Sequence, residues 1–136
     1  VEVTLSYEDP LVCFLGDTTG AVFLDHPEIL QQHRVIVVEC SFIDDDNLKR
    51  SEVTKHMHWN ALQPHVEANP DTMFLLTHFS LKYSTISLRR FFQEQQERYP
   101  NIHPMLVEDE VVEQWKPSDA SNEEGPPTCN CKICRC

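Results

Sequence analysis

The 136-residue sequence predicts an α/β fold with one mixed sheet and flanking helices. Short apolar runs of strand length, such as 35–38 and 73–76, alternate with stretches that repeat apolar residues at the helical period. The length suits a single domain. No apolar run approaches the roughly 18 residues that a membrane-spanning helix needs, so we expect no membrane association.

The N-terminal third is predicted to contain a hairpin and a central strand. Residues 1–7 alternate apolar and polar, and residues 11–15 form a more apolar run, so the two should pair as a half-buried and a more buried strand. A short helix is expected from Pro27 to Gln32, because proline favours the first helical turn. The β-branched run 35–38 predicts a central strand buried on both faces.

Helices and strands alternate through the rest of the chain. In order, we expect an acidic loop over 44–47, a helix over 59–69, a strand over 73–76, a helix over 85–99 and a strand over 102–107. Ser84 or Thr85 can cap the last helix, whose apolar face holds Ile86, Leu88, Phe91 and Phe92. Residues 1–115 should form the domain. Residues 116–136 should be a disordered acidic linker and cysteine-rich tail, because their composition cannot build a core.

Charge and cysteine content limit the classes of function. The net charge of −11 disfavours nonspecific nucleic-acid binding by the whole surface, although Lys82, Arg89, Arg90 and Arg98 leave room for a local basic face. Cys13 and Cys40 lie in apolar runs and should pack as small hydrophobic side chains. Nothing resembles a secreted disulfide framework, so we expect an intracellular protein, cytoplasmic first, with the nucleus or mitochondrion as alternatives.

Three polar residues follow predicted strands: Asp17, Glu39 and His78. The carboxyl ends of such strands converge on one edge of a sheet, where ligands bind. Carboxylates and imidazoles suit zinc, with manganese as the alternative, and a metal pair can activate water. His56, oriented by Glu39, could protonate a leaving group. Taken singly, each residue also fits a structural role: a loop aspartate, a helix cap, a surface histidine, a histidine in the core.

The order and spacing of four motifs resemble the metallo-β-lactamase superfamily, and within it ribonuclease Z, the tRNA 3′-endonuclease. The motifs are Gly16-Asp17-Thr18, Glu39-Cys40-Ser41-Phe42, His56-Met57-His58 and His78-Phe79-Ser80-Leu81-Lys82-Tyr83. The resemblance implies that Asp17 bridges two zinc ions, that His78 is a zinc ligand, that His56 is the proton donor and that Glu39 supports it. Three positions depart from the family pattern: Ser41 replaces threonine, Lys55 glycine and Lys82 arginine.

The main metal motif of that superfamily, His-X-His-X-Asp-His, is not found in this sequence. Residues 56–61 begin as His-X-His but continue with Asn60 and Ala61. We therefore expect the chain to be the C-terminal half of an αββα sandwich. Asp17 and His78 are too few ligands for a catalytic zinc ion, which takes three as a rule, so a missing N-terminal half or a homodimer partner should complete the site.

Three functions are consistent with these residues. The first is a metal-dependent hydrolase of the ribonuclease Z kind that cleaves tRNA precursors at the 3′ end, with RNA as its partner. The second is another dinuclear hydrolase of this fold, acting on a small ester or a cyclic phosphodiester. The third is an inactive truncated or metal-binding module. The tail contains four closely spaced cysteines, Cys129, Cys131, Cys134 and Cys136. Their thiolates could form a site for zinc or a soft ion. Alternatively, the tail is a disordered segment that binds metal adventitiously or is sensitive to oxidation.

Overall fold

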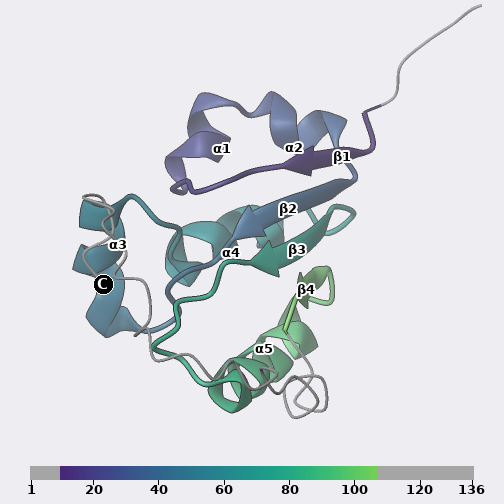
Figure 1. Ribbon diagram of the computed structural model, residues 1–136. Coiled ribbons are helices and arrows are strands. Elements are labelled where there is room, and N and C mark those ends of the chain that lie inside the picture. The colour runs from purple at the N-terminus through teal and green to yellow at the C-terminus, as the bar shows by residue number, and fades with distance from the viewer. Residues whose placement is uncertain (1–9, 107–136) are drawn as a thin grey trace, which may run out of the picture.

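The structure, a computed structural model, describes residues 10–106. Its sheet has four strands in the order β1 (Val12–Phe14), β2 (Val35–Glu39), β3 (Met73–Thr77) and β4 (Ile102–Pro104). All neighbouring strands pair in parallel (Figure 1). The strand predicted over residues 1–7, which would make the sheet mixed, lies outside the described residues, as do the domain boundary at 115 and the tail.

The helices lie in the crossovers between these strands. They are α1 (Ala21–Asp25), α2 (Glu28–Gln32), α3 (Leu48–Thr54) after a short 3-10 turn η1 (Asp45–Asn47), α4 (Trp59–Ala68) and α5 (Thr85–Arg98). The structure confirms α2, α4 and α5, and the cap of α5 is Ser84, whose hydroxyl accepts from the Ser87 amide. No helix within 10–106 has both the length and the apolar character needed to cross a membrane.

Two helices and one buried position were predicted wrongly. Both α1 and α3 were missed, because each is short and α3 buries only Ser51. The acidic run 44–47 forms η1 at the start of α3 rather than an open loop. Ile86 is 73% exposed, although it was expected on the apolar face of α5.

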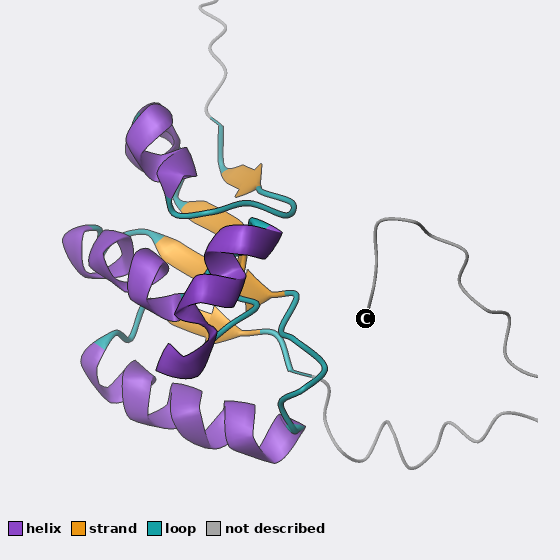
Figure 2. Cartoon of the chain, turned by 90° about the vertical axis from the view of Figure 1, so that its left-hand side faces the viewer, coloured by secondary structure: helices purple, strands orange, loops and turns teal. Residues whose placement is uncertain are grey.

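The core lies between the sheet and the helices on one of its faces. Alternate strand residues point into it, so that Ile36, Val38, Phe74 and Leu76 are fully buried. Helices supply the other side of the core through Phe23, Leu62, Val66, Leu88 and Phe92. Figure 2 shows these helices gathered on one side of the sheet.

The opposite face of the sheet has no covering layer within the described residues. Val12, Phe14 and Met73 are 58%, 75% and 42% exposed, and Val35 and Val37 are only half-buried. The expectations that 11–15 is a buried strand and that 35–38 is buried on both faces are therefore wrong for this face. Parallel sheets are normally covered on both faces. The arrangement is compatible with half of a metallo-β-lactamase sandwich, in which a second sheet would cover this face.

Candidate metal centre

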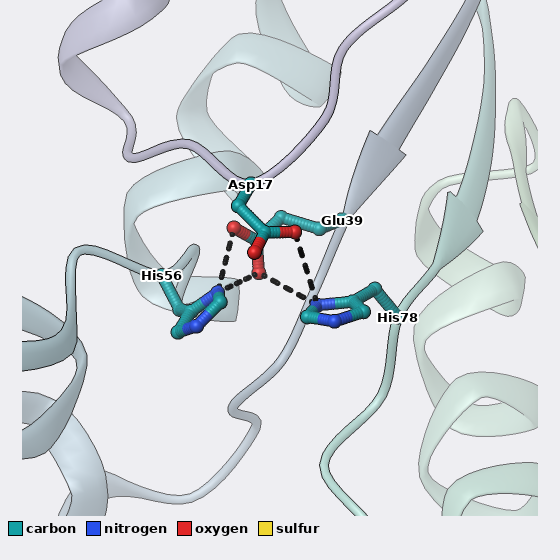
Figure 3. Close-up of side chains that lie close together, drawn as sticks. All are labelled: Asp17, Glu39, His56 and His78. Atoms are coloured by element: carbon teal, nitrogen blue, oxygen red, sulfur yellow. Dashed lines mark hydrogen bonds and ion pairs between the residues drawn. The ribbon is translucent and has the colours of Figure 1, made fainter. Parts of the chain in front are cut away.

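Four predicted residues converge at the carboxyl edge of the sheet. Asp17, Glu39, His56 and His78 each place one potential ligand atom within 4.8 Å of the others (Figure 3). Glu39 ends β2, His78 directly follows β3, and Asp17 lies in the loop after β1. His56 comes from the loop between α3 and α4. Parallel pairing explains this convergence, because it brings the carboxyl ends of β1, β2 and β3 to one edge.

Glu39 is the buried centre of the group. Its carboxylate accepts hydrogen bonds from the Thr18 amide at 2.6 Å, the Ser41 hydroxyl at 2.6 Å and Nδ1 of His56 at 3.0 Å. The residue is only 1% exposed, and these donors satisfy a carboxylate that would otherwise be costly to bury. The bond to Thr18 also holds the loop that presents Asp17.

His78 leaves β3 with an unusual backbone conformation. Its φ of 56° lies in the left-handed region, which residues other than glycine rarely adopt. Ser41 contacts it twice: Oγ lies 3.1 Å from the ring Nδ1 and 2.9 Å from the His78 carbonyl oxygen. The same Nδ1 lies 3.5 Å from Oε2 of Glu39 and 3.7 Å from Oδ1 of Asp17. The ring is thus held at its Nδ1 edge, while 54% of the side chain is exposed.

His56 follows a residue that ends α3 in the left-handed conformation. Lys55 has φ of 60°, and its amide donates to the Ser51 carbonyl. The resemblance led us to expect glycine here, and the backbone explains that expectation, because glycine adopts this conformation without a steric penalty. The His56 ring then lies beside that of His78, with centroids 5.2 Å apart. A cavity of about 200 Å³, which sequence reasoning missed, lies beside His56 and is lined in part by Thr19 and Lys55.

His58 has a structural role rather than a place in the group. Its Nδ1 accepts from the Asn60 amide and caps α4, while Nε2 donates to the Asp44 carbonyl at 2.8 Å. Both ring nitrogens are therefore used. This agrees with our rejection of residues 56–61 as the main metal motif.

Lys82 anchors the segment that follows His78. Its ammonium lies 2.8 Å from Oδ2 of Asp44 and 4.5 Å from the centre of the Tyr83 ring. The Tyr83 hydroxyl accepts a bond from the Ile43 amide. Burial alone would raise the pKa of Asp44, but hydrogen bonds from Lys82 and Asn47 outweigh it and lower this pKa below its ordinary value. The ammonium of Lys82 thus donates one hydrogen bond to the carboxylate, whereas the planar guanidinium of arginine could donate two.

The other cysteines and histidines lie outside the group. Cys40 is buried, as expected, and burial together with the nearby charge of Glu39 raises the pKa of its thiol far above the ordinary value. Cys13 is only partly buried. The four tail cysteines lie outside the described residues. His26, His33, His65 and His103, for which we expected surface or packing roles, are absent from the metal-binding group.

The donor set fits part of a metal site. Glu39 is buried and already accepts three hydrogen bonds, so it is better placed to support than to coordinate. Asp17 and His78 have side chains that are 68% and 54% exposed, so both are accessible from solvent. A carboxylate and an imidazole are suitable zinc ligands, but catalytic zinc takes three protein ligands as a rule. The described residues therefore supply an incomplete set.

Sequence comparison relates the chain to tRNase Z proteins. No protein-family model matches it. It is 33% identical to tRNase Z TRZ1 of Arabidopsis thaliana over 86 residues, which cover 62% of this chain and 31% of that protein. It is 28% identical to the chloroplastic tRNase Z TRZ2 of the same plant over 92 residues, 65% of this chain and 26% of that protein. The chain thus spans about a third or less of the length of these relatives.

Proposed function

We propose that this chain supplies part of the dinuclear zinc site of a ribonuclease Z-like phosphodiesterase that cleaves tRNA precursors at their 3′ ends. The observation that carries this proposal is the convergence of Asp17, Glu39, His56 and His78 within 4.8 Å. The relationship to tRNase Z proteins supports RNA as the substrate class. The remaining ligands would come from an N-terminal half of the sandwich or from a homodimer partner.

Asp17 and His78 are the proposed metal ligands. Their side chains are the exposed members of the group, and Oδ1 of Asp17 lies 3.7 Å from the Nδ1 edge of the His78 ring. A carboxylate has two oxygens and can therefore bridge a metal pair. When bound, two zinc ions would polarise the phosphate and supply an activated water, and manganese is the alternative metal.

His56 is the proposed proton donor. A carboxylate can only accept, so Nδ1 of His56 carries the proton in its bond to Glu39. Nε2 is then the nitrogen that can hold and release a proton toward the leaving oxygen. Through this bond Glu39 orients the His56 ring for proton transfer.

A small cavity lies beside the proposed proton donor. It adjoins His56 rather than Asp17, and Lys55 and Glu52 both lie on its wall. The ammonium of Lys55 would attract a phosphate group of RNA, and the carboxylate of Glu52 would oppose that attraction.

Activity of a completed site tests this function. The chain would be produced joined to an upstream half that carries the His-X-His-X-Asp-His motif, loaded with zinc, and assayed on a tRNA precursor and on a nitrophenyl phosphodiester. We expect cleavage at the 3′ boundary of the tRNA. Hydrolysis of small esters or cyclic phosphodiesters alone would favour the second function, and full metal content without hydrolysis would favour an inactive module.

A further inference from the structure

We propose that Ser41 is a positioning residue, which holds a proton on Nδ1 of His78 and so leaves Nε2 as the nitrogen that binds metal. Ser41 is 4% exposed and lies between Glu39 and His78. Its Oγ is 2.6 Å from Oε2 of Glu39 and 3.1 Å from Nδ1 of His78. The significance of the tautomer for metal binding rests on the function proposed above, but the tautomer itself does not.

The direction of this hydrogen-bonded chain follows from the chemistry of its members. Two oxygens that can only accept lie near the Ser41 hydroxyl: Oε2 of Glu39 at 2.6 Å and the His78 carbonyl oxygen at 2.9 Å. The shorter contact, which is charge-assisted, takes the hydroxyl proton. A hydroxyl has one proton, so Oγ can meet Nδ1 of His78 only as an acceptor. The proton of that bond must therefore come from Nδ1.

The surroundings of Nδ1 disfavour the other tautomer. With the proton on Nε2, the lone pair of Nδ1 would face three oxygen atoms: Oγ of Ser41, Oε2 of Glu39 at 3.5 Å and Oδ1 of Asp17 at 3.7 Å. Two of these oxygens carry negative charge. An N–H at this position turns the same contacts into attractive ones.

Ser41 also restrains the backbone that carries the ring. Its carbonyl oxygen accepts a hydrogen bond from the Ser80 amide at 3.1 Å. This bond lies two residues after His78, whose backbone has the left-handed φ of 56°. One buried carboxylate thus orients two imidazoles, His56 directly and His78 through Ser41.

The tautomer can be measured directly in the metal-free chain. Long-range ¹H–¹⁵N NMR of the histidine-labelled protein at about pH 8.5, where ordinary imidazoles are neutral, reports which ring nitrogen carries the proton. We expect His78 to have the Nδ1–H form, with its signal assigned by loss in His78→Gln. Ser41→Thr keeps the hydroxyl and should keep this form. Ser41→Val has the shape of threonine without the hydroxyl and should shift His78 toward the Nε2–H form.

Metal affinity gives a second measurement. In the completed site, Ser41→Val should weaken zinc binding by about 10–100-fold, whereas Ser41→Thr should restore it. An Nε2–H tautomer in the unmodified chain would overturn the proposal, and so would a folded Ser41→Val that keeps the original tautomer. The unmodified spectrum decides the question even if Ser41→Val does not fold. A failure of RNA cleavage would leave this tautomer result standing, so the two proposals fail separately.

Discussion

Both carboxylate oxygens of Glu39 lie 3.0 Å from Nδ1 of His56, although one residue ends β2 and the other follows α3. The contact places a negative charge that is 1% exposed beside a ring that is 24% exposed. It also joins the sheet to the segment between α3 and α4. The pair should therefore matter for stability as well as for chemistry.

Glu39→Gln should lower the free energy of unfolding by about 2 kcal/mol, because it replaces charge-assisted bonds and turns an amide toward existing donors. Chemical denaturation followed by circular dichroism measures this change. Glu97→Gln removes the same charge from an exposed position on α5 and should change stability by less than about 0.5 kcal/mol. Equal effects of the two substitutions would mean that the buried contacts of Glu39 are not important for stability.

The sequence predicted which residues converge better than it predicted what surrounds them. The convergence of Asp17, Glu39 and His78 was predictable because each lies at or just after the end of a strand, and parallel strands end at a common edge. The hydrogen bond between His78 and Ser41 was not predictable, since it joins residues far apart in the chain and depends on the left-handed backbone of His78. Val35 and Val37 were expected to be buried because a β-branched run does not reveal how many layers cover a sheet.

The open face of the sheet should cause the isolated chain to associate. Phe14 is 75% exposed on β1, next to Val12 and the half-buried Val37. We expect size-exclusion chromatography with light scattering to show dimers or larger species, and Phe14→Lys to reduce them. Leu81→Lys changes an even more exposed leucine, in a turn away from the sheet strands, and serves as the control. A chain that is monodisperse and monomeric, with a cooperative melt, would show that this face needs no cover.

Substitution by glycine should have opposite effects on the free energy of unfolding at Lys55, whose backbone is left-handed, and at Lys49, which lies inside α3. Lys55→Gly should raise the free energy of unfolding by about 1 kcal/mol, because glycine has no Cβ to strain at φ of 60°. Lys49→Gly removes the same charge inside α3 and should lower it by up to about 1 kcal/mol. Thermal melts of the two variants provide the comparison. A loss of stability in both would mean that Lys55 is not strained.

The contact between Lys82 and Asp44 should make stability depend on acid pH. The folded-state pKa of Asp44 is lowered, so the pair stabilises the protein at neutral pH and this contribution is lost as pH falls through the folded-state pKa, below about 4. Lys82→Met should therefore lower stability at pH 7 by no more than about 1 kcal/mol, because the pair is partly exposed. The same substitution should also make the free energy of unfolding fall less steeply as the pH drops below about 4. Lys49→Met removes an exposed lysine without this contact, and an identical pH profile in the two variants would exclude the effect.

The most direct test of the proposed site combines metal analysis with kinetics in the completed protein. His78→Ala and Asp17→Ala should lose metal and activity together, because both are assigned as ligands. His56→Ala should keep a near-normal metal content while turnover on the tRNA precursor falls by about 10²–10⁴-fold, the usual contribution of a general acid. A nitrophenyl phosphodiester, whose leaving group needs no proton, should show a smaller loss.

His26→Ala, an exposed histidine outside the group, is the control and should behave as the unmodified protein. We expect the two histidine variants to differ in metal content, with zinc retained in His56→Ala and lost in His78→Ala. A His56→Ala protein that loses its metal, or one that cleaves the tRNA precursor at the full rate, would contradict the division between proton donor and ligand.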